Sequence, residues 1–496
     1  MRFSPQQEAV FAAILNTMEN LIILAVAGAG KTTVLKEICS IFTRGRIAFL
    51  AYNKKIADEI KLKVAHLNHV QAGTFHSFGF KAMVAFSHRA KMESNKMRTL
   101  AETISEDTRD FALAAVGLAK QAAFGIITPI ESRDAWYDLA THYELFNKLP
   151  ENAGADVIER AITDAITLLK SSNAILRTSF DFDDMLYGPL YLNLPLPTFA
   201  LVMVDEAQDT NPARRLFAKR MIAPGGRFVA VGDPHQAIYG FTGADNNSLD
   251  LIRDEFNCTV MPLTVTYRCP KAVVAHAQAW VNHITAADEA PEGLVRTIGF
   301  DAFNAESFVP NQDAILCRNT KPLVQMAFSL IRRGIGAKVE GRDIAEGLAK
   351  LAKRWKTNSL ATFQTRLNDY QARETQKLMS TGKELVAEQL TDKIDTLRVI
   401  IDSLPQNSTV RDLVDKIYSL FEPDDNGKPR NVVLLSTVHK SKGREWQRVF
   451  LLGRNLYMPS KWARQAWQQE QERNLIYVAV TRAKAELVEV DMPVPA

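Results

Sequence analysis

The chain has 496 residues, of which 47% are hydrophobic and 23% are charged, so it is long enough for three or four domains with cores of their own. This composition excludes disordered and collagen-like architectures, and no apolar run approaches the roughly 18 residues that would span a bilayer. Sixty Lys and Arg residues against 56 Asp and Glu leave a net charge of +4, which does not by itself indicate nucleic-acid binding.

Apolar runs alternate with amphipathic stretches in the first part of the chain. Residues 21–25 form a short apolar run that ends in a glycine-containing loop, and residues 31–38 have the apolar spacing of a helix. Residues 47–52 and 70–74 are typical of strands, and residues 54–65 between them are typical of a helix. This alternation predicts a parallel sheet that is covered by helices.

Two helical stretches interrupt the strand pattern. Strand signals fade over residues 75–179, which we interpret as a helical insertion, and three strand-like runs follow it. A second set of strands predicts another α/β domain, and a helical, charge-rich stretch at residues 336–429 interrupts that domain in turn. The later predicted strands are 201–204, 228–231, 259–263, 313–316, 432–436 and 448–452, with a helix at 321–332.

The N-terminus and the cysteines bear on where the protein works. The first residues show no basic region followed by an apolar stretch and a cleavage site, so we expect no secretory signal. The four cysteines, Cys39, Cys258, Cys269 and Cys317, have no CxxC spacing, which argues against a disulfide framework or a zinc site. We therefore expect an intracellular, cytoplasmic protein with no membrane association.

The first candidate for chemistry is the segment 25–32, where a predicted strand gives way to a predicted helix. Gly28 and Gly30 let backbone N–H groups converge on phosphate oxygens, and the helix N-terminus adds the positive end of its dipole. In such a loop Lys31 reaches the β- and γ-phosphates of ATP, and the hydroxyl of Thr32 binds Mg²⁺. A glycine-rich turn without a ligand rarely continues with Lys-Thr, so we predict a nucleotide site. Its other expected members are Ala27, Ala29 and Thr33.

Two acidic residues follow a later predicted strand. Asp205 and Glu206 come directly after an apolar run, at the end of the strand where a parallel sheet binds ligands. Asp205 can hold Mg²⁺, directly or through water, and Glu206 can accept a proton from the water that attacks the γ-phosphate. Acids after a strand are often solvated turn residues, but the upstream phosphate loop favours the catalytic interpretation.

Further short motifs follow in order along nearly the whole α/β framework. They occupy residues 3–7, 51–57, 73–77, 181–186, 231–241, 267–268, 437–446 and 477–484. With the phosphate loop and the carboxylate pair, they make the sequence resemble superfamily 1 DNA helicases of the UvrD/Rep type. The resemblance implies an α/β fold with two RecA-like parallel-sheet motor domains, each interrupted by a mainly helical insertion. The implied segments are 1–75 with 181–263 for the first motor domain, 76–180 for its insertion, 264–335 with 430–496 for the second motor domain, and 336–429 for a small accessory insertion.

The resemblance also assigns residues to the ATP site. Gln7 matches the glutamine that reads adenine in the family, although the spacing leaves Gln6 open. Gln236 matches a sensor of the γ-phosphate. Arg268 and Arg482 match two arginines that would face the γ-phosphate and stabilise the charge of the transferring group. The remaining matches are Tyr267, which would stack on adenine, and Glu445, near the nucleotide sugar.

A third group of matches concerns DNA. Tyr52 and Phe241 each follow a strand-like run beside polar motif residues, which suits a platform for base stacking, although either could be a core aromatic. Isolated histidines such as His76 and His439 more often satisfy buried polar groups, but in this context we expect a DNA-proximal or domain-coupling role. The other members of the implied DNA-contacting set are Asn53 and Thr74.

The resemblance implies an ATP-dependent DNA helicase or translocase that moves 3′ to 5′ along single-stranded DNA as ATP closes the cleft between its motor domains. The expected cofactors are ATP and Mg²⁺, and the expected partners are single-stranded and tailed duplex DNA. Two alternatives stay open. The chain could be the motor subunit of a helicase–nuclease or defence complex, with a nuclease or a repair or recombination protein as a separate partner. It could also be a DNA-dependent ATPase that displaces proteins with little unwinding.

Overall fold

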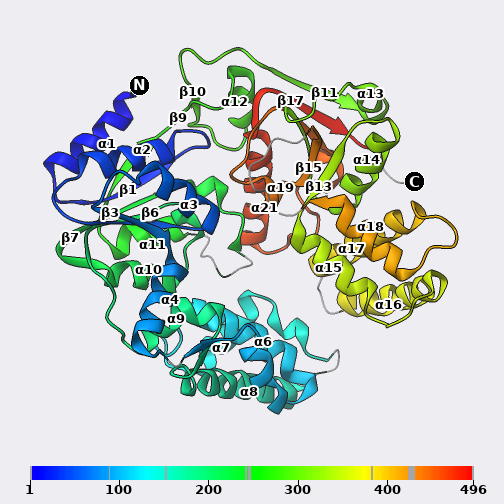
Figure 1. Cartoon of the computed structure of the whole chain (residues 1–496), viewed down its shortest axis with the longest axis horizontal. Coiled ribbons are helices and arrows are strands. Elements are labelled where there is room, and N and C mark those ends of the chain that lie inside the picture. The colour runs from blue at the N-terminus through cyan, green and yellow to red at the C-terminus, as the bar shows by residue number, and fades with distance from the viewer. Residues whose placement is uncertain are drawn as a thin grey trace. The chain divides into compact units, whose positions relative to one another are not determined.

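Two compact units divide the chain, Met1–Thr264 and Val265–Ala496. The computed structural model describes residues 3–88, 90–150, 153–240, 243, 247–380, 384–422 and 431–493. Each unit combines helices with one large sheet of parallel strands, which confirms the predicted α/β class with two RecA-like motor domains (Figure 1).

The first unit is built around a six-stranded sheet. Its strands are β1 (Asn20–Ala25), β2 (Ile47–Ala51), β3 (Val70–Thr74), β6 (Phe199–Val204), β7 (Ile222–Gly232) and β8 (Cys258–Leu263). They lie in the order β3-β2-β6-β7-β1-β8, and helices cover both faces of the sheet (Figure 1). The helices next to these strands are α1 (Pro5–Asn16), α2 (Lys31–Ile41), α3 (Lys54–Lys63), α10 (Pro212–Arg220) and α11 (Ser248–Glu255), with the short helices η3 (Ala207–Asp209) and η4 (Pro234–Gln236).

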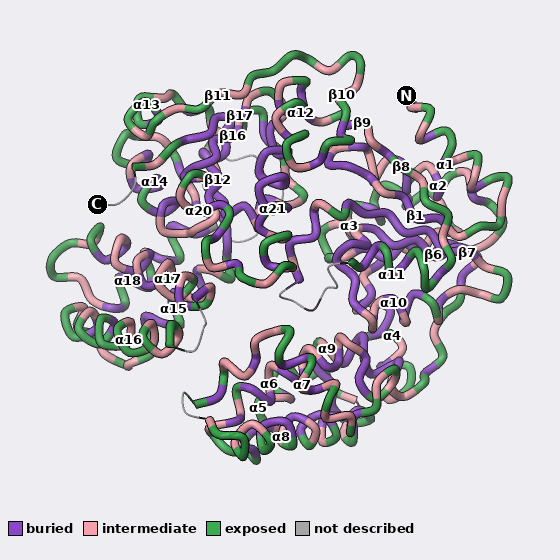
Figure 2. Tube along the Cα trace, turned by 180° about the vertical axis from the view of Figure 1, so that it is seen from behind, coloured by how far each residue is buried: buried purple, intermediate pink, exposed green. Residues whose placement is uncertain are grey.

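The register of this sheet aligns the ends of its central strands. Leu24 in β1 pairs with Gly232, the last residue of β7. Leu50 in β2 pairs with Val204, the last residue of β6. Strands β1, β2, β6 and β7 are mostly buried (Figure 2). Because the strands are parallel, the loops that follow them lie along one edge of the sheet, where parallel sheets bind ligands.

A helical insertion lies between β3 and β6 in the sequence. Its elements are α4 (Phe75–Phe86), β4 (Lys91–Met92), α5 (Lys96–Leu100), η1 (Ala101–Thr103), α6 (Glu106–Gln121), α7 (Arg133–His142), η2 (Leu145–Lys148), α8 (Ala155–Ala174), β5 (Ser179–Phe180) and α9 (Phe182–Tyr191). A buried ion pair network fixes the start of α9, because the Nζ atoms of Lys96 and Lys120 lie 2.6 Å and 2.7 Å from the carboxylate of Asp184. Burial by itself raises the pKa of Asp184, but the two lysines outweigh this effect and lower it.

The second unit is built around a seven-stranded sheet in the order β11-β17-β16-β12-β15-β13-β14. These strands are β11 (Leu294–Gly299), β12 (Asp313–Cys317), β13 (Ala337–Glu340), β14 (Phe421–Glu422), β15 (Val433–Thr437), β16 (Trp446–Leu452) and β17 (Ala483–Asp491). Two short strands, β9 (Val265–Thr266) and β10 (Thr285–Ala286), pair separately. The helices are α12 (Lys271–Ala277), α13 (Phe300–Ala305), α14 (Thr320–Arg332), α15 (Arg342–Ala352), α16 (Leu360–Ser380), α17 (Glu384–Asp402), α18 (Val410–Leu420), α19 (Val438–Ser441), α20 (Arg454–Tyr457) and α21 (Ala466–Val480).

All nine strands that the apolar runs predicted are present, with ends that differ by a few residues. The predicted helix at 54–65 ends earlier, at Lys63. All four cysteines are free thiols. Within the described residues, no helix is both long enough and apolar enough to cross a membrane.

Candidate functional site

The loop between β1 and α2 has the backbone of an anion-binding turn. Gly28 and Gly30 have φ angles of 77° and 81°, in the left-handed region that L side chains rarely adopt. Gly30 is the N-cap of α2, and no side chain caps the helix there. The first backbone N–H groups of α2 can therefore bind an anion, and the helix dipole favours one.

Lys31, the first residue of α2, lies among carboxylates. Its Nζ atom is 2.9 Å from Oε1 of Glu206, and both side chains are largely buried. Burial by itself lowers the pKa of Lys31. The carboxylates of Glu206, Asp205 and Asp233 outweigh burial, so the pKa is raised and the lysine stays charged. The predicted phosphate-binding lysine and the predicted catalytic carboxylate are therefore in direct contact.

Glu206 is held in place by its backbone and by a neighbour. Its φ of 51° is uncommon for a residue other than glycine, and it brings the chain into η3 directly after β6. The side-chain amide of Gln208 donates a hydrogen bond to Oε2 of Glu206. Oε1 of Gln208 accepts the backbone N–H of Asp233 at 3.1 Å. Gln208 is only 1% exposed, and it links the catalytic candidate to the loop after β7.

The loop after β7 carries the predicted γ-phosphate sensor. Nε2 of Gln236 donates to Oδ2 of Asp233 at 2.7 Å, and Oδ1 of Asp233 accepts the backbone N–H of His235 at 3.0 Å. Burial raises the pKa of Asp233, although nearby Lys31 opposes this. Gln236 therefore belongs to the same polar cluster as Lys31 and Glu206.

The two N-terminal glutamines have different partners. Gln7 forms a capping box with Ser4 at the start of α1, and its Nε2 donates to the carbonyl of Ala29 in the phosphate loop at 3.3 Å. Gln6 instead exchanges hydrogen bonds with Thr264, donating to Oγ1 at 3.0 Å and accepting the backbone N–H at 2.9 Å. Gln7 is thus the glutamine attached to the phosphate loop, and its adenine-reading role stays a prediction.

Thr32 and Asp205 are the predicted ligands of Mg²⁺. Thr32 is the second residue of α2, and Asp205, which is 3% exposed, follows β6. A hydroxyl and one carboxylate suit a Mg²⁺ ion whose remaining ligands are phosphate oxygens and waters. Among the described residues, no group of three acidic, histidine or cysteine side chains could hold a metal by itself. The donor set therefore fits a metal that arrives with a nucleotide.

Three predicted nucleotide residues lie together in the second unit. Nε of Arg268 is 2.7 Å from Oε2 of Glu445, and one of its terminal nitrogens is 3.4 Å from the carbonyl of Thr481. Arg482 is 1% exposed and also donates to the hydroxyl of Thr481, at 3.3 Å. It also donates to the carbonyls of Val478, at 2.8 Å, and Arg444, at 3.1 Å. Tyr267, next to Arg268, is 50% exposed.

His439 lies on α19, which packs against α21 in the second unit. Burial, and then the positive charge of Arg318, lowers its pKa to about 4. It is therefore a neutral side chain at physiological pH, so its contact with DNA stays a prediction that does not rest on positive charge.

Four of the predicted DNA-contacting residues lie at or just after the ends of strands β2 and β3, namely Tyr52, Asn53, Thr74 and His76. Asn53 and Thr74 act as N-caps, because their side-chain oxygens accept backbone N–H groups of α3 and α4 at 2.9 Å and 3.1 Å. The Tyr52 ring is parallel to that of Tyr239 with centroids 6.1 Å apart, and the guanidinium of Arg214 lies 4.6 Å from its centroid. Phe241 lies outside the described residues, so its stacking role stays a prediction.

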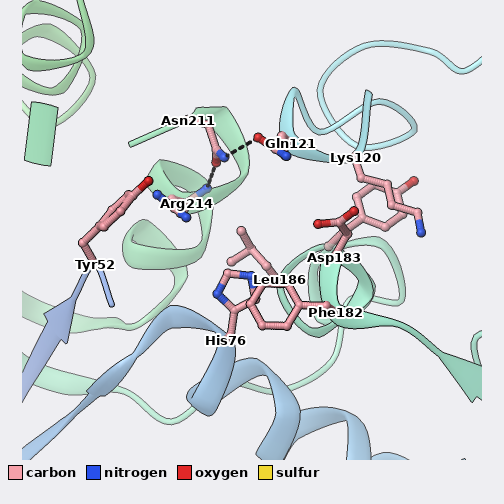
Figure 3. Close-up of a pocket in the computed structure, with 10 residues that line it drawn as sticks. Tyr52, His76, Lys120, Gln121, Phe182, Asp183, Leu186, Asn211 and Arg214 are labelled. Carbon is pink, nitrogen blue, oxygen red and sulfur yellow. Dashed lines mark hydrogen bonds between the residues drawn. The ribbon is translucent and has the colours of Figure 1, made fainter. Parts of the chain in front are cut away.

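A pocket with a volume of about 150 Å³ brings Tyr52 and His76 together. His76 stacks on Phe182 with ring centroids 4.1 Å apart (Figure 3). Burial, and then Arg214, lowers the pKa of His76 to about 4. Asp183 and Arg214 also line the pocket, with Leu186, Tyr187, Lys120, Gln121 and Asn211.

Sequence reasoning gave no role to Gln208, Arg214 or Asp183. Asp183 belongs to the 181–186 motif, which marked the segment but not the residue. Gln208 follows the acidic pair by two residues, and that spacing was the only signal of its contact with Glu206.

Comparisons with known proteins show two matches to family models. Residues 4–257, more than half of the chain, match the family model described as the UvrD/REP helicase N-terminal domain. Residues 337–489 match the model described as the UvrD-like helicase C-terminal domain.

Similar curated proteins include two from bacteria and one from yeast. The chain is 22% identical to the ATP-dependent DNA helicase PcrA of Bacillus subtilis, over 97% of this chain and 81% of that protein. It is 23% identical to the ATP-dependent DNA helicase UvrD2 of Mycobacterium tuberculosis, over 96% of this chain and 77% of that protein. The ATP-dependent DNA helicase srs2 of Schizosaccharomyces pombe is 26% identical over 52% of this chain, which spans only 33% of that protein.

Proposed function

The chain belongs to the UvrD/Rep helicase family, which makes it an ATP-dependent DNA helicase, and from this premise we propose that it moves 3′ to 5′ along single-stranded DNA. One observation carries the proposal of a motor. In the loop after β7, Asp233 binds Gln208 and Gln236 and so belongs to the polar cluster around Lys31 and Glu206. Three residues after Gln236, the ring of Tyr239 lies parallel to that of Tyr52. A single loop thus joins the residues proposed for ATP to a residue proposed for DNA.

The first unit supplies the phosphate-binding and catalytic groups. The backbone from Ala27 to Gly30 and the side chain of Lys31 bind the phosphates, and Gln7 reads adenine. Thr32 and Asp205 would hold Mg²⁺, which when bound neutralises phosphate charge. Glu206 accepts the proton of the attacking water, and Gln208 orients its carboxylate for that task.

The exchange of partners by Lys31 is the first step that the contacts support. Lys31 is paired with Glu206, and the γ-phosphate of ATP competes for the same cation. When Lys31 turns to the phosphate, the Glu206 carboxylate is released toward the water, while Gln208 still holds its other oxygen. Gln208 also accepts the backbone N–H of Asp233, so this change of partners is transmitted to the loop that carries Gln236 and Tyr239.

The second unit contributes Tyr267 to adenine, Glu445 to the sugar, and Arg268 and Arg482 to the charge that develops on the γ-phosphate. An arginine supplied from a separate element is worth several orders of magnitude in phosphoryl transfer. Because hydrolysis requires groups from both units, each turnover is coupled to a step along the strand.

ATP hydrolysis measured with and without an unstructured single strand, such as oligo(dT), tests the motor. We expect several-fold stimulation by the strand, and we expect Glu206→Gln to lose the activity under both conditions. An equal rate with and without DNA would contradict the proposal. The exposed acid Glu8 on α1 provides the matched control, because Glu8→Gln makes the same chemical change away from the polar cluster.

A further inference from the structure

A buried arginine in β7 holds the C-terminal end of α1. The side chain of Arg227 is 1% exposed, and its Nη1 donates to the carbonyl of Ile14 at 2.8 Å. Its Nη2 and Nε donate to the carbonyl of Glu19, at 2.7 Å and 3.0 Å. Ile14 lies in the last turn of α1, where carbonyls have no partner within the helix and where a positive charge suits the helix dipole. Arg44 also donates to the carbonyl of Leu15 there, at 2.7 Å, but Arg44 is exposed, so water can take its place.

Arg227 lies at the edge of the sheet opposite the phosphate loop. It pairs with Leu201 near the start of β6, whereas the phosphate loop follows the end of β1. Helix α1 spans this distance, because its residue Gln7 donates to the carbonyl of Ala29 in that loop at 3.3 Å. The seven residues from Gln7 to Ile14 correspond to about 10 Å along the axis of a helix. A single helix therefore connects Arg227 to the glutamine proposed to read adenine.

Hydrogen bonds at both ends fix the position of α1 along its axis. The buried face of the helix consists of Gln7, Val10 and Ile14. Apolar burial is non-directional, whereas hydrogen bonds weaken steeply when their distance or angle changes. Gln6 and Gln7 bind other elements at the start of the helix, and Arg227 does so at its end. A change at Arg227 therefore leaves the far end of the helix free to shift, and Gln7 shifts with it.

The Gln7 amide is the group that such a shift would affect. Its Oε1 accepts the backbone N–H of Ser4 at 3.1 Å, and its Nε2 donates to Ala29. A side-chain amide offers two acceptor sites and two N–H donors, so Gln7 keeps one of each among its contacts with the described residues. Adenine presents an amino donor beside the N7 acceptor, whereas guanine presents a carbonyl in place of the amino group. A correctly placed Gln7 therefore favours ATP over GTP.

We propose that Arg227 is a positioning residue for adenine recognition, because its guanidinium fixes the axial position of α1 and thereby holds the Gln7 amide at the phosphate loop. The planar guanidinium donates to Ile14 and Glu19 at once, and the compact ammonium of lysine cannot reproduce this geometry. Arg227 acts through Gln7 and not on the substrate, so its loss should affect nucleotide binding and base selectivity rather than the chemical step. The inference rests on the proposed function, because it requires that Gln7 reads adenine.

The test measures KM and kcat of the full chain for ATP and for GTP at saturating oligo(dT). In the wild-type protein we expect the KM for ATP to be roughly tenfold below that for GTP. In Arg227→Lys the KM for ATP should rise about fivefold while kcat and the KM for GTP stay nearly unchanged, as expected for a loss of ground-state binding. Arg220→Lys is the matched control, because Arg220 donates to the carbonyls of Leu190 and Leu194 at and after the end of α9. It should keep the wild-type ratio of the two KM values.

Two further variants complete the design. In the double variant Gln7→Ala/Arg227→Lys the ratio should equal that of Gln7→Ala, because a residue that acts only through Gln7 has no effect once its side chain is gone. Arg227→Gln places no charge in the buried site and keeps N–H donors, so it provides the measurement if Arg227→Lys does not fold.

The outcomes separate this inference from the proposed function. A Gln7→Ala protein that keeps the wild-type ratio would overturn adenine reading by Gln7, which is part of the proposed function. If Gln7→Ala loses the ratio while Arg227→Lys and Arg227→Gln keep it, only the positioning role of Arg227 is overturned. The same role is overturned if Arg220→Lys changes the ratio as much as Arg227→Lys does, or if neither Arg227 variant folds, because both results indicate a general role in stability.

Discussion

Lys31 and Glu206 form an ion pair, but substitutions at the two positions are expected to have different effects. Lys31→Ala should weaken nucleotide binding, because it removes a charge that faces the phosphates. Glu206→Gln should keep nucleotide and DNA affinity but lower turnover by about a hundredfold or more, as expected for loss of a general base. Nucleotide Kd and single-turnover hydrolysis measure the two effects. Lys36→Ala, at an exposed position of α2, is the control, and wild-type turnover in a folded Glu206→Gln protein would refute the assigned role.

Gln208 is expected to act on Glu206 without touching substrate, as a positioning residue. Gln208→Leu removes the donor to Glu206 and the acceptor for the Asp233 backbone at similar size. Since hydrogen bonds to charged groups are worth about 1.5–3 kcal/mol, we expect kcat to fall roughly ten- to a hundredfold with little change in KM for ATP. Steady-state kinetics and a melting curve decide the matter. A kcat equal to the wild-type value in a stable Gln208→Leu protein would remove Gln208 from the mechanism.

At the residue scale, a site residue could be predicted when the elements next to it in the chain indicated its place. Lys31 was predictable because it follows an apolar strand and a glycine-containing loop, and Glu206 because it belongs to the acidic pair directly after an apolar strand. The contact of Gln208 with Asp233 was not predictable from the sequence, because it depends on β6 and β7 lying side by side. The cap roles of Asn53 and Thr74 could have been read from their places just before helices, and they leave the DNA role of both residues a prediction.

At the scale of elements, the pair formed by Arg318 and Glu472 lies near His439 of α19. Arg318 donates to Glu472 of α21 at 2.8 Å, and His439 of α19 lies close enough to Arg318 for its charge to oppose protonation. The unfolded histidine titrates near 6.5 and the folded one near 4, so the unfolded chain binds more protons below pH 6.5. Stability is therefore lost as pH falls from about 6.5 toward 4.

His439→Asn should reduce this loss. We expect the fall in melting temperature between pH 7 and pH 5 to shrink by a few degrees, since about 1 kcal/mol corresponds to roughly 2–4 °C in a domain of this size. Thermal unfolding at the two pH values measures the difference, and His283→Asn changes an exposed histidine as the control. If His439→Asn and the wild-type protein lose the same number of degrees, His439 does not supply this proton linkage.

Element prediction succeeded where strands are apolar on both faces and failed where they carry charge. Strand β2 is buried at every position and was found from its apolar run. Strand β17 was missed, because its buried residue Glu489 interrupts the pattern. The structure satisfies that carboxylate with His276, at 3.0 Å, and with Arg454, at 2.9 Å, partners distant in the sequence.

At the scale of the whole molecule, the two units carry different groups of the predicted site residues. The first holds the phosphate loop and the paired Lys31 and Glu206, and the second holds the clustered Arg268 and Arg482. The alternation of strand-like and helical stretches along the chain predicted the α/β class of both units. The division into four domains stays a prediction, because the positions where a helical insertion leaves and rejoins a motor domain have no distinct residue pattern.

The central claim is that hydrolysis at the Lys31 and Glu206 cluster drives the chain 3′ to 5′ along one DNA strand. Unwinding of two duplexes that differ only in the polarity of their single-stranded tail tests it most directly, with ATP present and with Glu206→Gln protein as the control. The account predicts that the wild-type protein separates the 3′-tailed duplex and leaves the 5′-tailed one paired, and that Glu206→Gln separates neither. Equal unwinding of both duplexes, preference for the 5′ tail, or unwinding by Glu206→Gln would contradict it.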